Sequence, residues 1–120
     1  MSELILPVKQ GEELNIHFYV KEDGEIFDLS NYSIHVQVKA APLVTAKPMI
    51  DKIITDTSDY NDVGQITDPQ DGSFFIHLKK SDTSFPTGDY SLVIALVADD
   101  FYDIISSKCC NKAIYRICEQ

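Results

Sequence analysis

The chain has 120 residues, of which 44% are hydrophobic, and it carries a formal net charge of −9. This length predicts one domain over residues 1–120, and the composition is typical of a folded core and not of a disordered chain. So acidic a balance excludes nonspecific nucleic-acid binding, which requires basic patches.

The sequence shows no targeting signal. The first 13 residues lack the basic region and long apolar run of a signal peptide. No apolar run approaches the ~18 residues of a membrane span. We therefore expect no membrane partner, and folding in a reducing cytoplasm. The use of cysteine agrees with this compartment. The chain has three cysteines, an odd number, and no CxxC pair, so we expect free thiols at Cys109, Cys110 and Cys118.

The first third of the chain alternates between apolar and polar residues. Residues 4–8 predict a short strand, in which Pro7 suits the edge of a sheet. Residues 14–20 and 33–39 each predict a half-buried strand. Between them, an Asp-Gly pair at 23–24 predicts a tight turn, because both residue types tolerate positive φ.

Residues 40–71 predict a long loop region. Residues 49–56 favour either a strand or a short helix, because their alternation is imperfect. Residues 57–71 are polar and rich in aspartate, with a short strand at 64–67 as an option. Loops of this length often carry function.

The clearest signal is a pair of alternating runs within residues 68–97. The apolar positions that share a face are Phe74, Ile76 and Leu78 in the first run, and Tyr90, Leu92, Ile94 and Leu96 in the second. We expect these runs to be paired antiparallel strands with one buried face. Tyr90 follows Gly88 at the start of its strand, which is where β-sandwiches place a corner tyrosine that bonds upstream backbone.

The second of these strands is apolar on both faces. Its nominal outer face holds Val93, Ala95 and Val97. Such a strand is either covered or faces a partner. Residues 40–48 could cover it, or the strand could form a subunit interface; both interpretations stay open.

Two further strands are expected at residues 101–107 and 113–118. The total is seven to nine short antiparallel strands separated by turns. This pattern predicts an all-β, immunoglobulin-like Greek-key β-sandwich.

Candidate chemical sites are weak. His17, His35 and His77 each lie on the polar face of a strand, and could bind a metal only if those strands were neighbours. The aspartates at 56, 59, 62, 68 and 71 have the composition of a calcium loop without its spacing. Nucleophile, zinc-protease and phosphate-loop motifs are absent. We predict no enzyme, no catalytic residue, no cofactor and no metal.

The order of turns and strands resembles one known family. The residues that carry the resemblance are Gly11-Glu12, Asp23-Gly24, Asp28-Leu29-Ser30, Asp68-Pro69, Gly72 and Gly88-Asp89-Tyr90. Over residues 10–98 this pattern is similar to small Ig-like β-sandwich domains in structural proteins of tailed bacteriophages, the nearest being the N-terminal domain of phage baseplate upper proteins.

The resemblance implies a non-enzymatic structural protein of the virion, in its tail, baseplate, neck or head surface, assembled in the host bacterial cytoplasm. The implied partners are other virion structural proteins and further copies of the chain. The residues predicted at such contacts are Tyr19, Phe75, Val93, Ala95 and Val97. Two alternatives remain open: a small acidic phage protein that inhibits a host factor, and a carbohydrate- or cell-surface-binding module.

Overall fold

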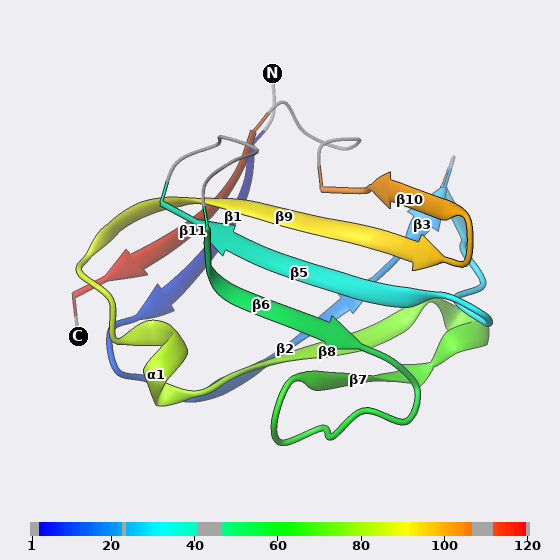
Figure 1. The fold of residues 1–120 in the computed structure, drawn as a ribbon, viewed down its shortest axis with the longest axis horizontal. Helices are drawn as coiled ribbons and strands as arrows, with labels where there is room; N and C mark the ends of the chain where they lie inside the picture. Colours follow the sequence, from blue (N-terminus) through cyan, green and yellow to red (C-terminus); the bar gives the residue numbers. More distant parts are fainter. Residues whose placement is uncertain (1–2, 23, 41–46, 107–111, 120) are drawn as a thin grey trace.

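The computed structural model describes residues 3–22, 24–40, 47–106 and 112–119, and nearly all of its regular structure is strand (Figure 1). Within these residues, six strands form the larger sheet. They are β1 (Glu3–Lys9), β11 (Lys112–Cys118), β9 (Gly88–Ala98), β5 (Ser33–Lys39) and β6 (Pro48–Ile54), in this spatial order, with β10 (Phe101–Ile104) also paired to β9.

A smaller sheet packs against the larger one. In the described part of the chain it has three strands, in the order β2 (Leu14–Tyr19), β8 (Ser73–Leu78) and β7 (Gly64–Asp68). The remaining elements are short: the hairpin β3 (Lys21–Glu22) and β4 (Glu25–Ile26), the 3-10 turn η1 (Pro69–Asp71) and the helix α1 (Lys80–Thr83).

The core lies between the two sheets and follows the predicted alternation. On β5 and β9 the inward side chains are at most 3% exposed, and on β8 at most 1%: Ile34, Val36, Val38, Leu92, Ile94, Leu96, Phe74, Ile76 and Leu78. Full burial of one such aliphatic or aromatic side chain contributes about 1.5–3 kcal/mol. The two-residue rhythm therefore marks the buried faces correctly, and the predicted β-sandwich is confirmed.

Two predictions about how the strands pair are wrong: one concerns which strands are neighbours, the other their direction. β8 and β9 do not pair with each other, because they belong to opposite sheets of the sandwich. Residues 79–87 separate them, too many for a tight hairpin, and α1 carries the chain from one sheet to the other. The strands are also not all antiparallel, because β1 runs parallel to β11. The rest of the domain supplies the long connection that a parallel pair requires.

The region 40–71 contains more structure than a loop. β6 is a strand and not a helix, because its residues extend the hydrogen-bonded ladder of β5 from Ile34–Ile54 to Val38–Ile50. β7 occupies the optional short strand and pairs with β8. Other predicted strands shift slightly: β10 ends at Ile104, and β1 lies at the sheet edge that Pro7 suggested.

Candidate functional site

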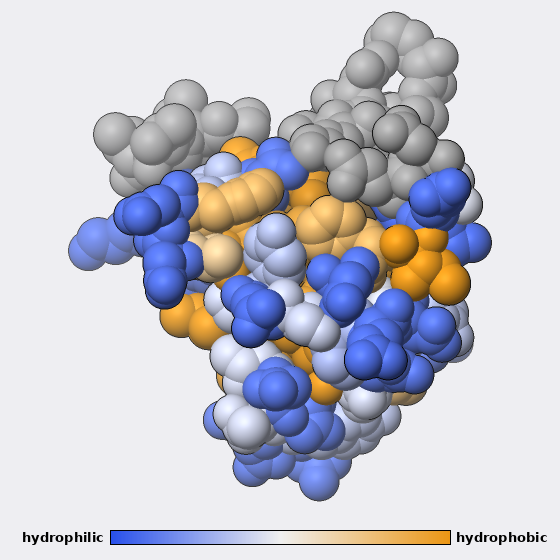
Figure 2. All heavy atoms as spheres, turned by 90° about the vertical axis from the view of Figure 1, so that its right-hand side faces the viewer, coloured by the Kyte–Doolittle hydropathy of each residue, from blue (hydrophilic) through white to orange (hydrophobic). Residues whose placement is uncertain are grey.

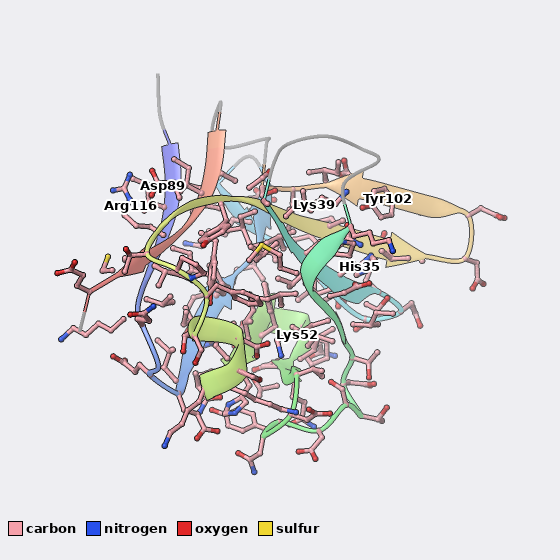
Figure 3. The ribbon with its side chains drawn as sticks, turned by 60° about the vertical axis from the view of Figure 1, so that its left-hand side comes forward. His35, Lys39, Lys52, Asp89, Tyr102 and Arg116 are labelled. Atoms are coloured by element: carbon pink, nitrogen blue, oxygen red, sulfur yellow. The ribbon has the colours of Figure 1, made fainter. Side chains whose placement is uncertain are left out.

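The outer face of the larger sheet exposes apolar side chains. Residues opposite one another in a sheet share a face, so the register places Tyr102 beside Val97, Ile104 beside Ala95, and His35 between Ala95 and Ile53. We call the group Ile53, Val93, Ala95, Val97, Tyr102 and Ile104 the outer patch. Figure 3 labels Tyr102, His35 and Lys39, which come from β10 and β5.

Exposure within the outer patch is uneven. Ile53 is 59% exposed, Tyr102 55% and Ile104 38%, whereas Ala95 is 0% exposed. Val93 and Val97 are half-buried. Ala95 therefore offers no accessible surface for the contact predicted from sequence. The most exposed side chains of the patch belong to its neighbours Tyr102, Ile104 and Ile53, which the sequence prediction missed. The alternation of apolar and polar residues in β10, next to the apolar strand β9, was a signal that could have found Tyr102 and Ile104.

Charges on this face largely cancel. His35 Nε2 lies 2.6 Å from Asp51 Oδ1. At the far end of the sheet, Arg116 donates two hydrogen bonds to Asp89, at 2.7 and 3.0 Å (Figure 3). Lys9 and Lys39 also point outward on this sheet, so the charges of the described side chains on this face come close to cancelling, while the whole chain carries −9. The outer patch is thus a nearly neutral apolar surface on a strongly acidic protein.

The outer face of the smaller sheet carries a row of rings. Tyr19, 60% exposed, contacts His17 with ring centroids 4.4 Å apart. His17 stacks on Phe75 at 4.1 Å, and Phe75 contacts Tyr60 at 5.3 Å. The structure therefore joins Tyr19 and Phe75, both predicted from sequence, through His17, which the β2–β8 register places opposite Phe75.

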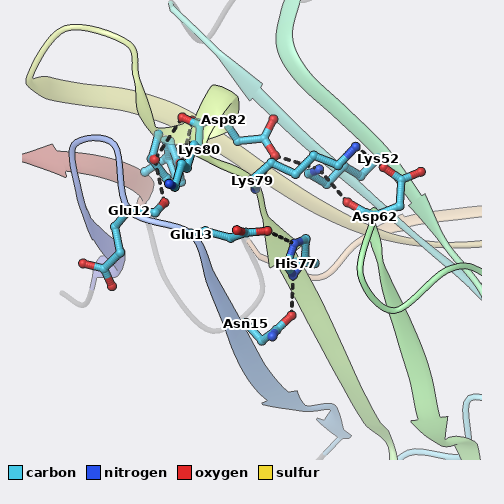
Figure 4. A network of polar contacts seen from close by, with 11 residues as sticks. Glu12, Glu13, Asn15, Lys52, Asp62, His77, Lys79, Lys80 and Asp82 are labelled. Carbon is cyan, nitrogen blue, oxygen red and sulfur yellow. Dashed lines mark hydrogen bonds and ion pairs between the residues drawn. The ribbon is translucent and has the colours of Figure 1, made fainter.

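The three histidines do not converge. His35 is on the larger sheet and the other two on the smaller one. His77 is only 4% exposed; its Nδ1 lies 2.6 Å from Asn15 Oδ1 and its Nε2 3.0 Å from Glu13 Oε2 (Figure 4). Among the described residues, no three histidine, cysteine, aspartate or glutamate side chains gather to hold a metal. His77 instead ties β8 to the start of β2.

A buried ion pair links α1 to the larger sheet. Lys52 Nζ lies 2.9 Å from Asp82 Oδ2, with the two side chains 7% and 17% exposed (Figure 4). Asp82 also accepts a hydrogen bond from the backbone N–H of Lys79 at 2.9 Å. The hydroxyl of Tyr115 donates to the Asp82 backbone oxygen at 2.9 Å. Burial, aided by the Asp82 charge, raises the pKa of the Tyr115 hydroxyl, which stays a donor at neutral pH.

The corner tyrosine is confirmed. The Tyr90 hydroxyl donates to the Pro86 backbone oxygen at 2.5 Å, just before Gly88 opens β9. Of the cysteines, Cys118 is a half-buried free thiol, and Cys109 and Cys110 lie outside the described residues, as does most of the covering segment considered above. In the described part of the chain, no helix has the length and apolar character to span a bilayer.

No family model matches the chain, and no curated protein matches it. Among solved structures it is similar to the NK cell receptor Nkp44, with 11% sequence identity, a TM-score of 0.54 and coverage of 100% of each chain. The chain is an Ig-like β-sandwich. A chain of the ZIG-8–RIG-5 IG1–IG1 heterodimer also matches, with 13% identity, a TM-score of 0.45 and coverage of 98% of this chain and 84% of the other. At these identities the likeness concerns the fold alone.

Proposed function

We propose that this chain is a non-enzymatic structural protein that assembles by protein–protein contacts in the particle of a tailed bacteriophage. The observation that carries the assembly function is the outer patch, where Ile53, Tyr102 and Ile104 stand exposed on one sheet face. The phage assignment is supported by the resemblance of the turn-and-strand pattern over residues 10–98 to Ig-like domains of phage structural proteins.

The size of the patch sets the strength of the contact. Burying a half-exposed Ile or Tyr side chain gains about 1 kcal/mol, roughly half the value for full burial. Three such side chains from each of two copies then give about 6 kcal/mol, which is comparable with the 4–15 kcal/mol cost of association. A single contact is therefore weak. Because the same patch of both copies is used up, this contact closes as a two-fold dimer, and a closed ring requires a second surface on each copy.

Charge predicts how this association responds to salt. Each copy carries −9, so two copies repel one another at low ionic strength. The outer patch itself is nearly neutral and loses little when salt screens its ion pairs. We therefore expect self-association to strengthen as salt is raised, the opposite of an interface held by complementary charges.

Sedimentation velocity over a concentration series tests the assembly function. Val93→Lys places a charge within the outer patch and should shift the chain to monomer with little loss of melting temperature, because the half-buried side chain points out of the core. Thr87→Lys adds the same charge in an exposed loop and should associate like the wild type. A chain that is monomeric at every concentration and salt level, or equal behaviour of the two variants, contradicts the proposal.

The virion location needs a separate experiment. An antibody against the chain should label purified particles of the phage or prophage that encodes it, and the chain should sediment with those particles. Its recovery only from the particle-free lysate, bound to a host protein, would contradict the virion assignment and favour inhibition of a host factor.

A further inference from the structure

A pocket of about 600 Å³ opens at one end of the sandwich. Three segments form its walls: residues 29–33 before and at the start of β5, residues 55–57 after β6, and residues 97–99 at the end of β9. Ile66 and Pro69 add to its lining. Figure 2 looks onto this end of the molecule, where hydrophilic residues surround patches of apolar ones.

Hydrogen bonds within the protein fix each wall. The backbone N–H of Leu29 donates to the Pro69 oxygen at 2.7 Å. The backbone N–H of Ile66 donates to the Thr55 oxygen at 2.9 Å. Ser33 Oγ lies 3.4 Å from the Val97 oxygen, joining the first wall to the third. The pocket is therefore formed before any ligand arrives, which lowers the ordering cost of binding.

The pocket is acidic. Asp56 and Asp99 line it and are exposed, and the lining contains no lysine, arginine or histidine. Within the described residues, neither carboxylate forms an ion pair. Since the whole chain is also strongly acidic, an anionic ligand is repelled and a cationic one is attracted.

The other lining groups favour one kind of cation. Ser30, Thr57 and Asn31 add oxygen acceptors to the lining of the pocket. Tyr32 adds an aromatic ring, which contacts Phe27 at 5.4 Å and Phe101 edge-on at 5.7 Å. A guanidinium has five donors in a plane and pairs with carboxylates and aromatic rings, whereas an ammonium is a strongly hydrated point charge.

We propose that this pocket receives an arginine side chain from a partner protein. The contact goes beyond the proposed self-association, because its charge complementarity calls for a basic partner and not for a second acidic surface of the same kind. The partner is defined by an exposed arginine that can enter the end of the sandwich.

The test is an NMR titration of the ¹⁵N-labelled chain with a capped Gly-Arg-Gly peptide, with Gly-Lys-Gly and Gly-Gln-Gly as comparisons. The arginine peptide should give saturable shifts at the amides of Ser30, Thr57 and Asp99, with a dissociation constant on the order of millimolar. The lysine peptide should bind more weakly and the glutamine peptide should not bind. Equal binding of the arginine and lysine peptides, or shifts scattered over the surface, would overturn the proposal.

Two double variants provide the control. Asp56→Asn with Asp99→Asn should weaken binding of the arginine peptide by about tenfold or more. Glu12→Gln with Glu119→Gln removes the same charge near α1 and the C-terminal strand, away from the pocket, and should change it less than about twofold. Equal weakening by both would show general attraction to an acidic protein and refute the site.

The same variants separate this proposal from the proposed function. The Asp56 and Asp99 substitutions should change self-association no more than the Glu12 and Glu119 substitutions do, and Val93→Lys should change peptide binding no more than Thr87→Lys does. Because both aspartates are exposed, their amides should keep the chain folded, and the dispersion of the NMR spectrum verifies this directly.

Discussion

Neutralising Asp82 should leave the buried cation Lys52 without its ion-pair partner. In Asp82→Asn the amide oxygen still accepts the Lys79 backbone N–H, so the start of α1 keeps its hydrogen bond and only the charge is lost. Among the described residues, Lys52, 7% exposed, then keeps a 3.4 Å contact from Nζ to the Asp62 backbone oxygen and the weaker attraction of the Asp62 carboxylate. Removing one partner of a buried ion pair costs about 3–5 kcal/mol. Asp82 itself is 17% exposed, so we expect the lower end, about 3 kcal/mol.

This magnitude is measurable. At about 2.1 cal/mol/K per residue, unfolding of a chain this long has an entropy of about 0.25 kcal/mol/K, so a loss of about 3 kcal/mol lowers the melting temperature by about 12 °C. Thermal melts followed by circular dichroism at pH 7 give this shift. The matched control is Lys79→Ala, which breaks an ion pair with Asp62 whose side chains are 46% and 51% exposed. Solvent screens an exposed pair, so its loss should cost far less than the loss of the buried one.

A second substitution shows whether Asp82→Asn destabilises the protein through the unpaired charge of Lys52 or through loss of packing. Lys52→Met retains the length of the side chain without its charge. Combined with Asp82→Asn, it should restore stability to within about 1 kcal/mol of the wild type, because no buried ion remains. If Asp82→Asn costs no more than Lys79→Ala, or if Lys52→Met fails to rescue it, the reasoning is wrong.

Three further outcomes are expected. Gly64→Ala should prevent folding or lower the free energy of unfolding by more than about 4 kcal/mol, because an added Cβ would lie 2.0 Å from a backbone oxygen. Its control is Gly11→Ala, where an added Cβ would meet nothing within 4 Å; in thermal melts it should cost only about 1 kcal/mol. Tyr90→Phe removes the corner hydrogen bond and should lower the free energy of unfolding in urea by about 1 kcal/mol; no change would deny it a role. The hydrogen bond and charge of Lys79 lower the pKa of Asp62 below its usual 3.8, so in an NMR titration Lys79→Ala should raise it toward 3.8. The stability from this carboxylate is present above pH ~4 and is lost as pH falls through its lowered pKa.

Local patterns in the sequence predict local structure well here. The alternation of β5 and β8 predicts which side chains are buried, because the strand period alone decides which face each residue occupies. Tyr90 was predictable for a similar reason: its role depends on a four-residue corner and one backbone acceptor. Neither requires knowledge of the neighbouring strand.

Pairing between strands was not predictable in the same way. Alternation shows that Phe74 and Leu92 are buried, but not that their strands belong to opposite sheets instead of one ladder. The contact between His17 and Phe75 likewise depends on the β2–β8 register, which no short stretch of sequence contains. Lys52 left a signal that could have been used: it occupies the inward phase of β6, between Ile50 and Ile54, where a lysine requires a buried partner.

The parallel pairing of β1 with β11 determines where fusions would leave the molecule. Glu3 lies opposite Lys112 and Lys9 opposite Cys118, so the chain enters the fold beside the start of the last strand, while the last strand exits one strand length away. Six residue steps at about 3.3 Å separate these points by about 20 Å. A fluorescent label attached before residue 3 and another attached after residue 119 would emerge at different poles of the sandwich, and a linker for circular permutation would have to run the full length of its edge.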